Sequence, residues 1–215
     1  MGSTRLPGKV LRPIAGKPLL EHILFRLSFL QHAATIVIAT TDSPRDAVVA
    51  EFCKDRGVEC FRGSETNVLD RYARCAKHYA FDQIVRLTAD NPFTDIARLD
   101  DLIDMHERSK SDFSHSFGVL PVGGGAEIFT IHALEKCRRE STAAHHFEHV
   151  DEYMLEHPEL FKTSLLPARQ GEMHAAVRLT VDTEEDYRKA CFIMEHASGQ
   201  YVSTGEAVAL CLRFA

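Results

Sequence analysis

The first nine residues place two glycines, two hydroxyl side chains and the cations Arg5 and Lys9 in one short segment. Glycine lets backbone N–H groups approach an anion closely, and the two cations would neutralise phosphate charge. The segment is not a Walker A loop, because five residues rather than four separate Gly2 from Gly8 and because Val10 follows Lys9. It predicts a phosphate-binding loop of another kind, with a terminal segment of no function as the alternative.

Lys17 lies in a second basic turn, Ala15-Gly16-Lys17-Pro18, which precedes a stretch of helical periodicity. The N-terminus of a helix favours anions through its dipole and its free N–H groups. Lys17 is therefore a second candidate for contact with a phosphate. The alternative is a solvated lysine at a helix start that Pro18 alone explains.

Two aspartates directly follow segments with a strand pattern. Asp90 comes after 83–88, and Asp182 comes after 176–181. In an alternating α/β fold, ligands bind at the carboxyl ends of the strands, and carboxylate oxygens suit Mg²⁺. Mg²⁺ together with a cationic loop meets the needs of phosphoryl or nucleotidyl transfer. The two aspartates are candidates to share one Mg²⁺, although each also fits a turn or a helix cap.

A histidine-rich segment, His145-His146-Phe147-Glu148-His149, contains the H-x-x-E-H order of inverted zinc proteases. His145 and His149 would lie one helical turn apart, with Glu148 beside them. A zinc hydrolase built on these three residues is thus an alternative function. The sequence suggests no third zinc ligand, so a histidine-rich surface helix or the wall of a sugar pocket is favoured instead.

These candidates need elements to position them, and the first half of the chain alternates helix and strand patterns. The predicted helices cover 17–31, 43–57, 67–80 and 95–108, and the predicted strands cover 35–40, 58–61 and 83–88. This order implies an α/β fold with a mostly parallel sheet covered by helices on both faces. The run at 35–40 is rich in β-branched residues, as expected of a buried parallel strand.

The second half is less regular. Strands are expected at 112–117, 126–130, 163–166 and 176–181, and helices at 131–139, 143–156, 184–197 and after 203. The glycine-rich segment 121–125 predicts a flexible loop. At 215 residues, the chain is long enough for one domain, 1–215, with a sizeable core.

Composition limits the partners and the compartment. The formal charge of −6 argues against a nucleic-acid groove, and the six cysteines contain no C-x-x-C pair, which favours reduced thiols. No apolar run reaches the length of a membrane span, and the signal-peptide pattern is missing. A cytoplasmic protein without a membrane or nucleic-acid partner is expected.

Seven segments resemble the cytidylyltransferases similar to CMP-KDO synthetase and acylneuraminate cytidylyltransferase, and most closely the spore coat polysaccharide biosynthesis protein F group. They occur in family order over nearly the whole chain. The segments are MGSTRLPGKVL, GKPLLEH, FRGSETNVLDRY, IVRLTADNP, AEIF, EHV and RLTVDTEEDY. Together they are specific, although each alone is not.

The resemblance implies a Rossmann-like nucleotidyltransferase fold with a nucleotide-binding half at about 1–110 and a sugar-binding and dimerisation half at about 111–215. It implies transfer of CMP from CTP to a sugar acid in surface polysaccharide or glycan biosynthesis, with Mg²⁺ as cofactor and pyrophosphate as product. A non-catalytic nucleotide-binding relative is the alternative. The implied roles are nucleotide binding by Gly2, Ser3, Arg5, Lys9 and Arg71, catalysis by Arg5, Lys9, Lys17 and Asp90, and metal binding by Asp90 and Asp182.

The chain also departs from the family pattern. Relatives begin with a hydrophobic strand ahead of the Met-Gly-Ser segment, so the resemblance implies that the usual first, central strand of the sheet is missing. Either the gene start is placed too far downstream, or the core is open there with pairing groups that another chain could fill. Phe147 stands where relatives often have arginine, and Gly125-Ala126 stand near a usual acidic residue. A homodimer is implied, formed through 118–148.

Overall fold

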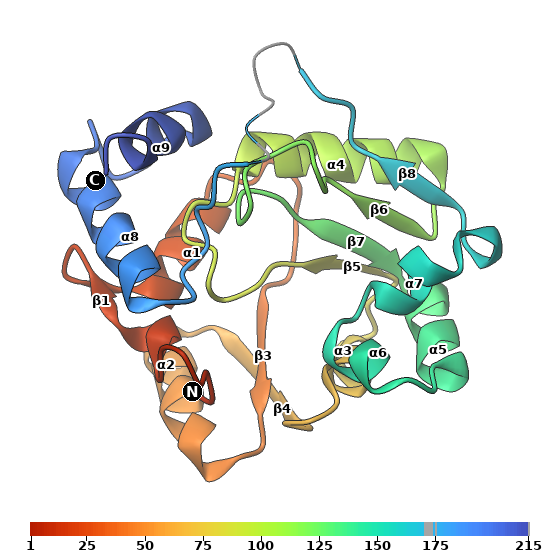
Figure 1. Cartoon of the computed structure of the whole chain (residues 1–215). Helices are drawn as coiled ribbons and strands as arrows, with labels where there is room; N and C mark the ends of the chain where they lie inside the picture. Colours follow the sequence, from red (N-terminus) through yellow and green to blue (C-terminus); the bar gives the residue numbers. More distant parts are fainter. Residues whose placement is uncertain (170–173, 175, 215) are drawn as a thin grey trace.

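The computed structural model describes residues 1–169, 174 and 176–214 (Figure 1). The elements of the first half are η1 (Lys9–Leu11), β1 (Pro13–Ile14), β2 (Lys17–Pro18), α1 (Leu19–Leu27), β3 (Val37–Thr41), η2 (Pro44–Asp46), α2 (Ala47–Arg56), β4 (Glu59–Gly63), α3 (Val68–His78), β5 (Gln83–Arg86) and α4 (Ile96–Ser109). Those of the second half are β6 (Phe113–His115), β7 (Glu127–Thr130), α5 (Ile131–Glu140), α6 (Ala144–Glu148), α7 (Glu152–Glu156), η3 (Pro158–Leu160), β8 (Thr163–Leu165), α8 (Glu184–His196) and α9 (Thr204–Cys211).

Local sequence explains where most of the longer helices begin. In five of the helices described, the side chain of the N-cap residue accepts a hydrogen bond from a backbone N–H three residues later, which satisfies a donor that the helix leaves free. These caps are Asn67, Asp95, Thr130, Thr183 and Ser203. No helix in the described part of the chain has the length and apolar character needed to cross a membrane.

The strands form two separate sheets and a short hairpin of β1 with β2. Strands β3 and β4 pair in parallel, whereas the larger sheet has the order β5-β7-β6-β8. In the larger sheet β7 runs antiparallel to β5 and β6, and β8 runs parallel to β6. The α/β class and the mostly parallel sheet are confirmed, because β5, β6 and β8 run in one direction and, among the described strands of this sheet, β7 alone is reversed. Strand β7 is reversed because a loop, not a crossover helix, joins β6 to β7.

The two sheets leave edges without a partner. Within the described residues, β3 pairs with β4 alone and β5 pairs with β7 alone. The run around β3 was expected to be buried, yet in β3 only Thr40 is buried while Val37, Ile38 and Ala39 are partly exposed. The expectation was wrong because, among the described strands, only β4 pairs with β3 and its other edge is left uncovered.

Alternation along β7 places helices on both faces of the larger sheet. Ile128 joins the buried cluster formed with Leu99 and Leu102 of α4. The next residue, Phe129, points the other way and stacks on Phe113, with ring centroids 5.4 Å apart, in the cluster that α3 and α5 complete. Successive side chains of a strand face opposite sides of its sheet, which explains the two layers.

A third cluster joins the beginning and the end of the chain. Leu6 and Ile14 pack there with Ile23 of α1 and with Val208 of α9. Figure 1 shows α8 and α9 returning to the side of the molecule that holds α1 and α2. The proposed halves at about residue 110 therefore share a core.

Two predicted elements of the second half were wrong. The helix expected at 143–156 is two short helices, α6 and α7, because the backbone at His149 is extended (φ −111°, ψ 109°). The strand expected at 176–181 forms no ladder and is joined to Val122 by one isolated bridge at Arg178. The remaining long helices were predicted correctly to within a few residues, except that α1 begins at Leu19 and ends at Leu27.

Candidate active site

Lys9, Asp90 and Asp182 meet at one point although they are far apart in the sequence. The Lys9 Nζ donates hydrogen bonds of 2.7 Å to Oδ2 of Asp90 and of 2.7 Å to Oδ1 of Asp182. The Lys9 side chain is 11% exposed, so this pair of ion contacts is shielded from most solvent. The structure thus brings together the lysine of the N-terminal loop and both aspartates that the sequence selected.

The N-terminal loop positions Lys9 through a left-handed turn and an apolar anchor. Gly8 has φ 70°, a conformation that glycine adopts without strain, and the 3-10 helix η1 starts at the next residue. Leu6 is buried in the core, and its N–H donates to Oγ of Ser3 at 3.2 Å. The Ser3 side chain therefore stabilises the conformation of the loop.

Asp90 is held by neighbours that the sequence reasoning did not select. The hydroxyl of Thr88 donates to Oδ1 of Asp90 at 2.6 Å, and the amide of Asn91 donates to Oγ1 of Thr88 at 2.7 Å. The N–H of Val181 donates to the backbone oxygen of Asp90 at 2.8 Å, which brings Asp182 alongside. The signal was present in the motif Thr-Ala-Asp-Asn, where short polar side chains flank the aspartate.

The segment 121–125 packs against this site. Gly123 has φ +91°, and a Cβ there would lie 2.7 Å from the backbone nitrogen of Thr180. The backbone oxygen of Gly124 accepts a 2.8 Å bond from the N–H of Asp95. Glycine at 123 thus permits the close approach that sets 176–181 beside Asp90.

Asp182 is surrounded by cations. Besides Lys9, Arg178 bonds to its Oδ2, and Nη2 of Arg5 lies 3.5 Å from its Oδ1. Burial raises the pKa of Asp182, but the hydrogen bond from Lys9 and the charges of Lys9, Arg178 and Arg5 outweigh burial, so its pKa lies below the ordinary value. Asp182 is therefore a carboxylate at neutral pH, and Arg178 is a candidate phosphate ligand that the sequence reasoning missed.

Three other predicted residues lie further from this point. Lys17 belongs to β2 and directly precedes Pro18, the N-cap residue of α1, and its Nζ lies 5.5 Å from the ring centre of Phe25. Lys17 also lines a hollow of about 300 Å³ that residues after α8 complete, and within the described residues it forms no hydrogen bond with Asp90 or Asp182. Gly2 lies beside Glu65, whose Oε1 is 3.4 Å from the position of a Cβ.

Arg71 lies in α3 next to the end of β4. Its Nη1 donates to the backbone oxygen of Ser64 at 2.6 Å, and its Nε has no hydrogen-bond partner among the described residues. Burial lowers the pKa of Arg71, although the negative charges of Asp46 and Asp42 oppose this effect. Arg71 thus supports the loop after β4.

The convergent carboxylates fit a divalent metal ion. Asp90 and Asp182 both direct one oxygen at the same cationic atom, Nζ of Lys9. Hard carboxylate oxygens are the donors that Mg²⁺ prefers, and a cation already occupies the point between them. The donor chemistry of these two carboxylates therefore fits Mg²⁺.

The structure does not assemble the predicted zinc trio. Within the described residues, the ligand atoms that gather within 4.8 Å belong to His145, His146 and Glu156, not to His145, Glu148 and His149. The alternative of a three-residue site on one helix is not supported, because α6 ends at Glu148 and the backbone of its C-cap residue, His149, is extended.

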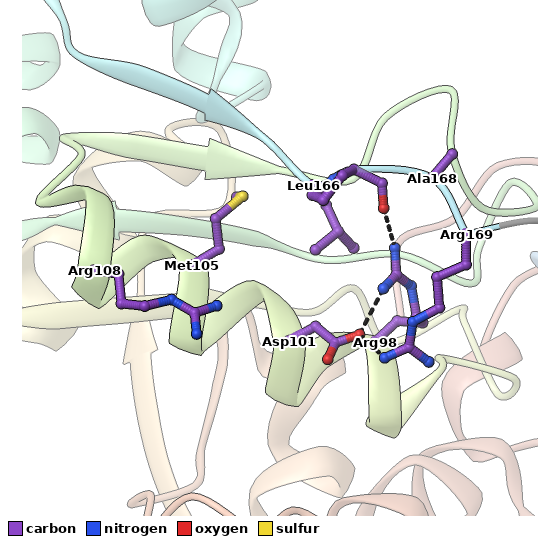
Figure 2. Close-up of a pocket in the computed structure, with 8 residues that line it drawn as sticks. Arg98, Asp101, Met105, Arg108, Leu166, Ala168 and Arg169 are labelled. Atoms are coloured by element: carbon purple, nitrogen blue, oxygen red, sulfur yellow. Dashed lines mark hydrogen bonds and ion pairs between the residues drawn. The ribbon is translucent and has the colours of Figure 1, made fainter.

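Another hollow, of about 270 Å³, lies beside α4 and away from the predicted residues (Figure 2). Arg98, Arg108 and Arg169 line it, and Asp101 forms ion pairs with Arg98 and Arg169. Figure 2 shows these two guanidinium groups directed at the one carboxylate. The hollow contains none of the residues selected from the sequence.

Comparisons with known proteins agree with one another. The model of a family described as Cytidylyltransferase matches residues 1–206. The chain is 35% identical over 219 residues to the spore coat polysaccharide biosynthesis protein SpsF of Bacillus subtilis, covering 99% of this chain and 91% of that protein.

Among solved structures, a cytidylyltransferase from Leptospira borgpetersenii superposes with a TM-score of 0.90 at 32% identity, covering 99% of this chain and 90% of that one. The structure of CMP:2-keto-3-deoxy-manno-octonic acid synthetase complexed with CTP has a TM-score of 0.66 at 17% identity, covering 90% of this chain and 94% of that one. The second similarity concerns the fold alone.

Proposed function

The chain belongs to the cytidylyltransferase family, whose members are nucleotidyltransferase enzymes, and from this premise we propose that it transfers CMP from CTP to a hydroxyl group of a sugar acid. Pyrophosphate is the second product, and Mg²⁺ is the cofactor. The activated sugar serves the synthesis of a surface polysaccharide or another glycan, as the name of the Bacillus subtilis relative suggests.

The observation that carries the proposal is the convergence of Lys9, Asp90 and Asp182. Two carboxylates and one ammonium at the carboxyl end of a strand form a site for a metal ion and phosphate groups together. Arg5 and Arg178 extend the positive charge on the side of Asp182. A sugar acid as acceptor is supported by the name of the similar synthetase that was solved with CTP.

The reaction requires alignment and charge neutralisation rather than covalent work by the protein. An oxygen of the sugar hydroxyl forms a bond to the α-phosphorus, the bond from that phosphorus to the oxygen bridging the β-phosphorus breaks, and the hydroxyl proton leaves to solvent. Lys9, Arg5 and Arg178 would bind the phosphate oxygens, and Asp90 and Asp182 would hold the metal ion. Bound Mg²⁺ neutralises negative charge that develops on the phosphates.

Gly2, Ser3 and Arg71 are proposed to shape the nucleotide pocket, with Lys17 close to the transferred phosphate. For Lys17 this requires the β1–β2 hairpin to move its ammonium away from Phe25. We also propose a single domain, a homodimer and a cytoplasmic enzyme that binds neither nucleic acid nor membranes.

The test incubates the purified chain with CTP, Mg²⁺ and a panel of sugar acids and measures pyrophosphate. One sugar acid should support release, and Asp90→Asn and Asp182→Asn should each lower the rate by about 10²-fold or more. Asp55→Asn, an exposed aspartate outside the site, should keep the wild-type rate. Binding of CTP without pyrophosphate release from any sugar would identify a non-catalytic relative, and failure to bind CTP would refute the proposal.

A further inference from the structure

Two short helices are tied together by a cluster of metal-binding side chains. His145 and His146 belong to α6, and Glu156 is the last residue of α7. Nε2 of His145 lies 2.8 Å from Oε1 of Glu156, and Nε2 of His146 lies 2.6 Å from Oε2 of the same carboxylate. Both imidazoles therefore direct the same nitrogen at one point between the helices.

The cluster has one buried and two accessible members. The side chain of His146 is 6% exposed, whereas those of His145 and Glu156 are 49% and 44% exposed. His146 also packs edge-on against Tyr153, with ring centroids 5.3 Å apart. One ligand position is thus fixed by packing, while the open side lets an ion enter.

The negative charge of Glu156 has no permanent counter-charge. Within the described residues, its ion pairs are with His145 and His146 only, and no lysine or arginine reaches it. A cation bound between these three side chains would place a positive charge directly against the Glu156 carboxylate.

We propose that His145, His146 and Glu156 bind a divalent transition-metal cation of the zinc class, which fastens α6 to α7. Two imidazole nitrogens and one carboxylate are a donor set that Zn²⁺ accepts, with a further position left for water. The candidate ligand atoms lie within 4.8 Å of one another, so small side-chain rotations bring them to the distances of about 2.0–2.2 Å that zinc requires.

The site differs in chemistry and in residues from the candidate active site at Lys9, Asp90 and Asp182. Asp90 and Asp182 offer oxygen alone, which favours Mg²⁺, whereas imidazole nitrogen favours zinc and its neighbours. Figure 1 shows α6 and α7 beside α3 and α5, at the end of the molecule opposite α8 and α9. The proposal therefore stands whether or not the chain transfers CMP.

The experiment titrates Zn²⁺ into metal-free protein without a polyhistidine tag and measures binding by calorimetry in the presence of excess Mg²⁺. We expect one zinc ion per chain at this site, a rise of the thermal midpoint on binding, and visible absorption bands when Co²⁺ replaces zinc. His145→Asn and Glu156→Gln, which change exposed side chains, should each weaken zinc binding at least tenfold. His146→Asn should do the same, and its circular dichroism should be compared first because His146 is buried.

The matched control is the double variant Glu148→Gln/His149→Asn, which removes the ligands that the sequence motif suggested and leaves the structural cluster intact. It should bind zinc like the wild type. The proposal is overturned if the wild type binds no stoichiometric zinc, if Mg²⁺ displaces it, or if the control loses binding while His145→Asn keeps it.

Discussion

At the scale of single residues, the ion pairs of Lys9 occupy the same carboxylates that the proposed metal ion would need. Its ammonium neutralises Asp90 and Asp182, each at 2.7 Å, where the proposed metal ion must also bind. Under the proposed function, the lysine would compete with the metal ion in the free enzyme. A phosphate of the bound nucleotide would offer the ammonium another anion and leave the carboxylates available to the ion.

This competition predicts opposite effects for Lys9→Met. Without nucleotide, the variant should bind Mn²⁺, used as a probe for Mg²⁺, several-fold more tightly, because two neighbouring carboxylates lose their internal cation. Its turnover should fall by about 10²-fold, because a charge that stabilises the transferring phosphate is lost. Calorimetry with Mn²⁺ and pyrophosphate release measure the two effects. The exposed Lys54→Met serves as control, and unchanged Mn²⁺ affinity in Lys9→Met would contradict the competition.

The sequence predicts part of this site for reasons that the structure makes clear. Asp90 and Asp182 stand directly after extended segments, and extended segments of one fold deliver their ends to a common edge. Arg178 escaped prediction because its contact with Asp182 depends on how the segment 176–181 bends, which no local pattern encodes. The histidine motif failed for a similar reason, since its spacing has meaning only on an unbroken helix.

At the scale of elements, His106 joins α4 to two strands. Its Nε2 lies 2.7 Å from Oε1 of Gln83 in β5, and its Nδ1 lies 2.7 Å from Oγ of Ser114, in β6. An amide oxygen can only accept, so Nε2 carries the proton and Nδ1 accepts from the serine hydroxyl. Burial lowers the pKa of His106 below its ordinary value of 6.5, although the charges of Glu107 and Asp112 oppose this effect.

This pKa predicts a pH dependence of stability with a definite sign. Because the folded chain binds this proton less readily than the unfolded chain, the stability contribution of neutral His106 is complete above the ordinary pKa of 6.5 and decreases as pH falls below it. His106→Gln should unfold more easily at pH 7.5, by about 1–2 kcal/mol, yet lose less further stability at pH 5.5 than the wild type. Urea unfolding at both pH values measures this, with exposed His132→Gln as control. Equal pH dependence in the wild type and His106→Gln would contradict the assignment.

Helices with a long apolar pattern were predicted correctly from the sequence. Segments whose structure depends on pairing with other segments were not. The helices α3, α4 and α8 follow from apolar spacing and from the caps Asn67, Asp95 and Thr183. The segment 176–181 has a strand pattern, but it meets Val122 at one bridge only. Strand β3 has the composition of a buried strand, yet its exposure depends on whether another strand pairs with its second edge. The residues of β3 itself do not determine this.

At the scale of the whole molecule, the site depends on the closure of the N-terminal and C-terminal parts of the chain on each other. Lys9 comes from the beginning of the chain, Asp90 from the middle and Asp182 from near the end. The apolar cluster formed by α1, α2, α8 and α9 packs these two parts of the chain together. Any change that loosens the cluster should therefore act on the site from a distance.

A substitution of Arg26 can test this dependence, because Arg26 links α1 to the segments around Thr94 and Val202. It lies in α1 and is 3% exposed, its Nε donates to the backbone oxygen of Thr94 at 2.7 Å, and its Nη1 donates to that of Val202 at 2.8 Å. The guanidinium lies 4.4 Å from the ring centre of Tyr201. Burial lowers the pKa of Arg26 below its ordinary value, and the two carbonyl contacts offset part of the cost of its desolvation.

Arg26→Met keeps much of the apolar volume but leaves both carbonyl groups without a donor, so we expect a loss of about 2–4 kcal/mol in the free energy of unfolding. Urea denaturation should show a lower midpoint with an unchanged slope. Exposed Arg188→Met, in α8, should stay within about 0.5 kcal/mol of the wild type. Because Thr94 lies four residues after Asp90, Arg26→Met should also bind Mn²⁺ more weakly under conditions in which it remains folded. If stability falls while Mn²⁺ affinity is unchanged, the closure of the chain supports the fold but does not position the carboxylates.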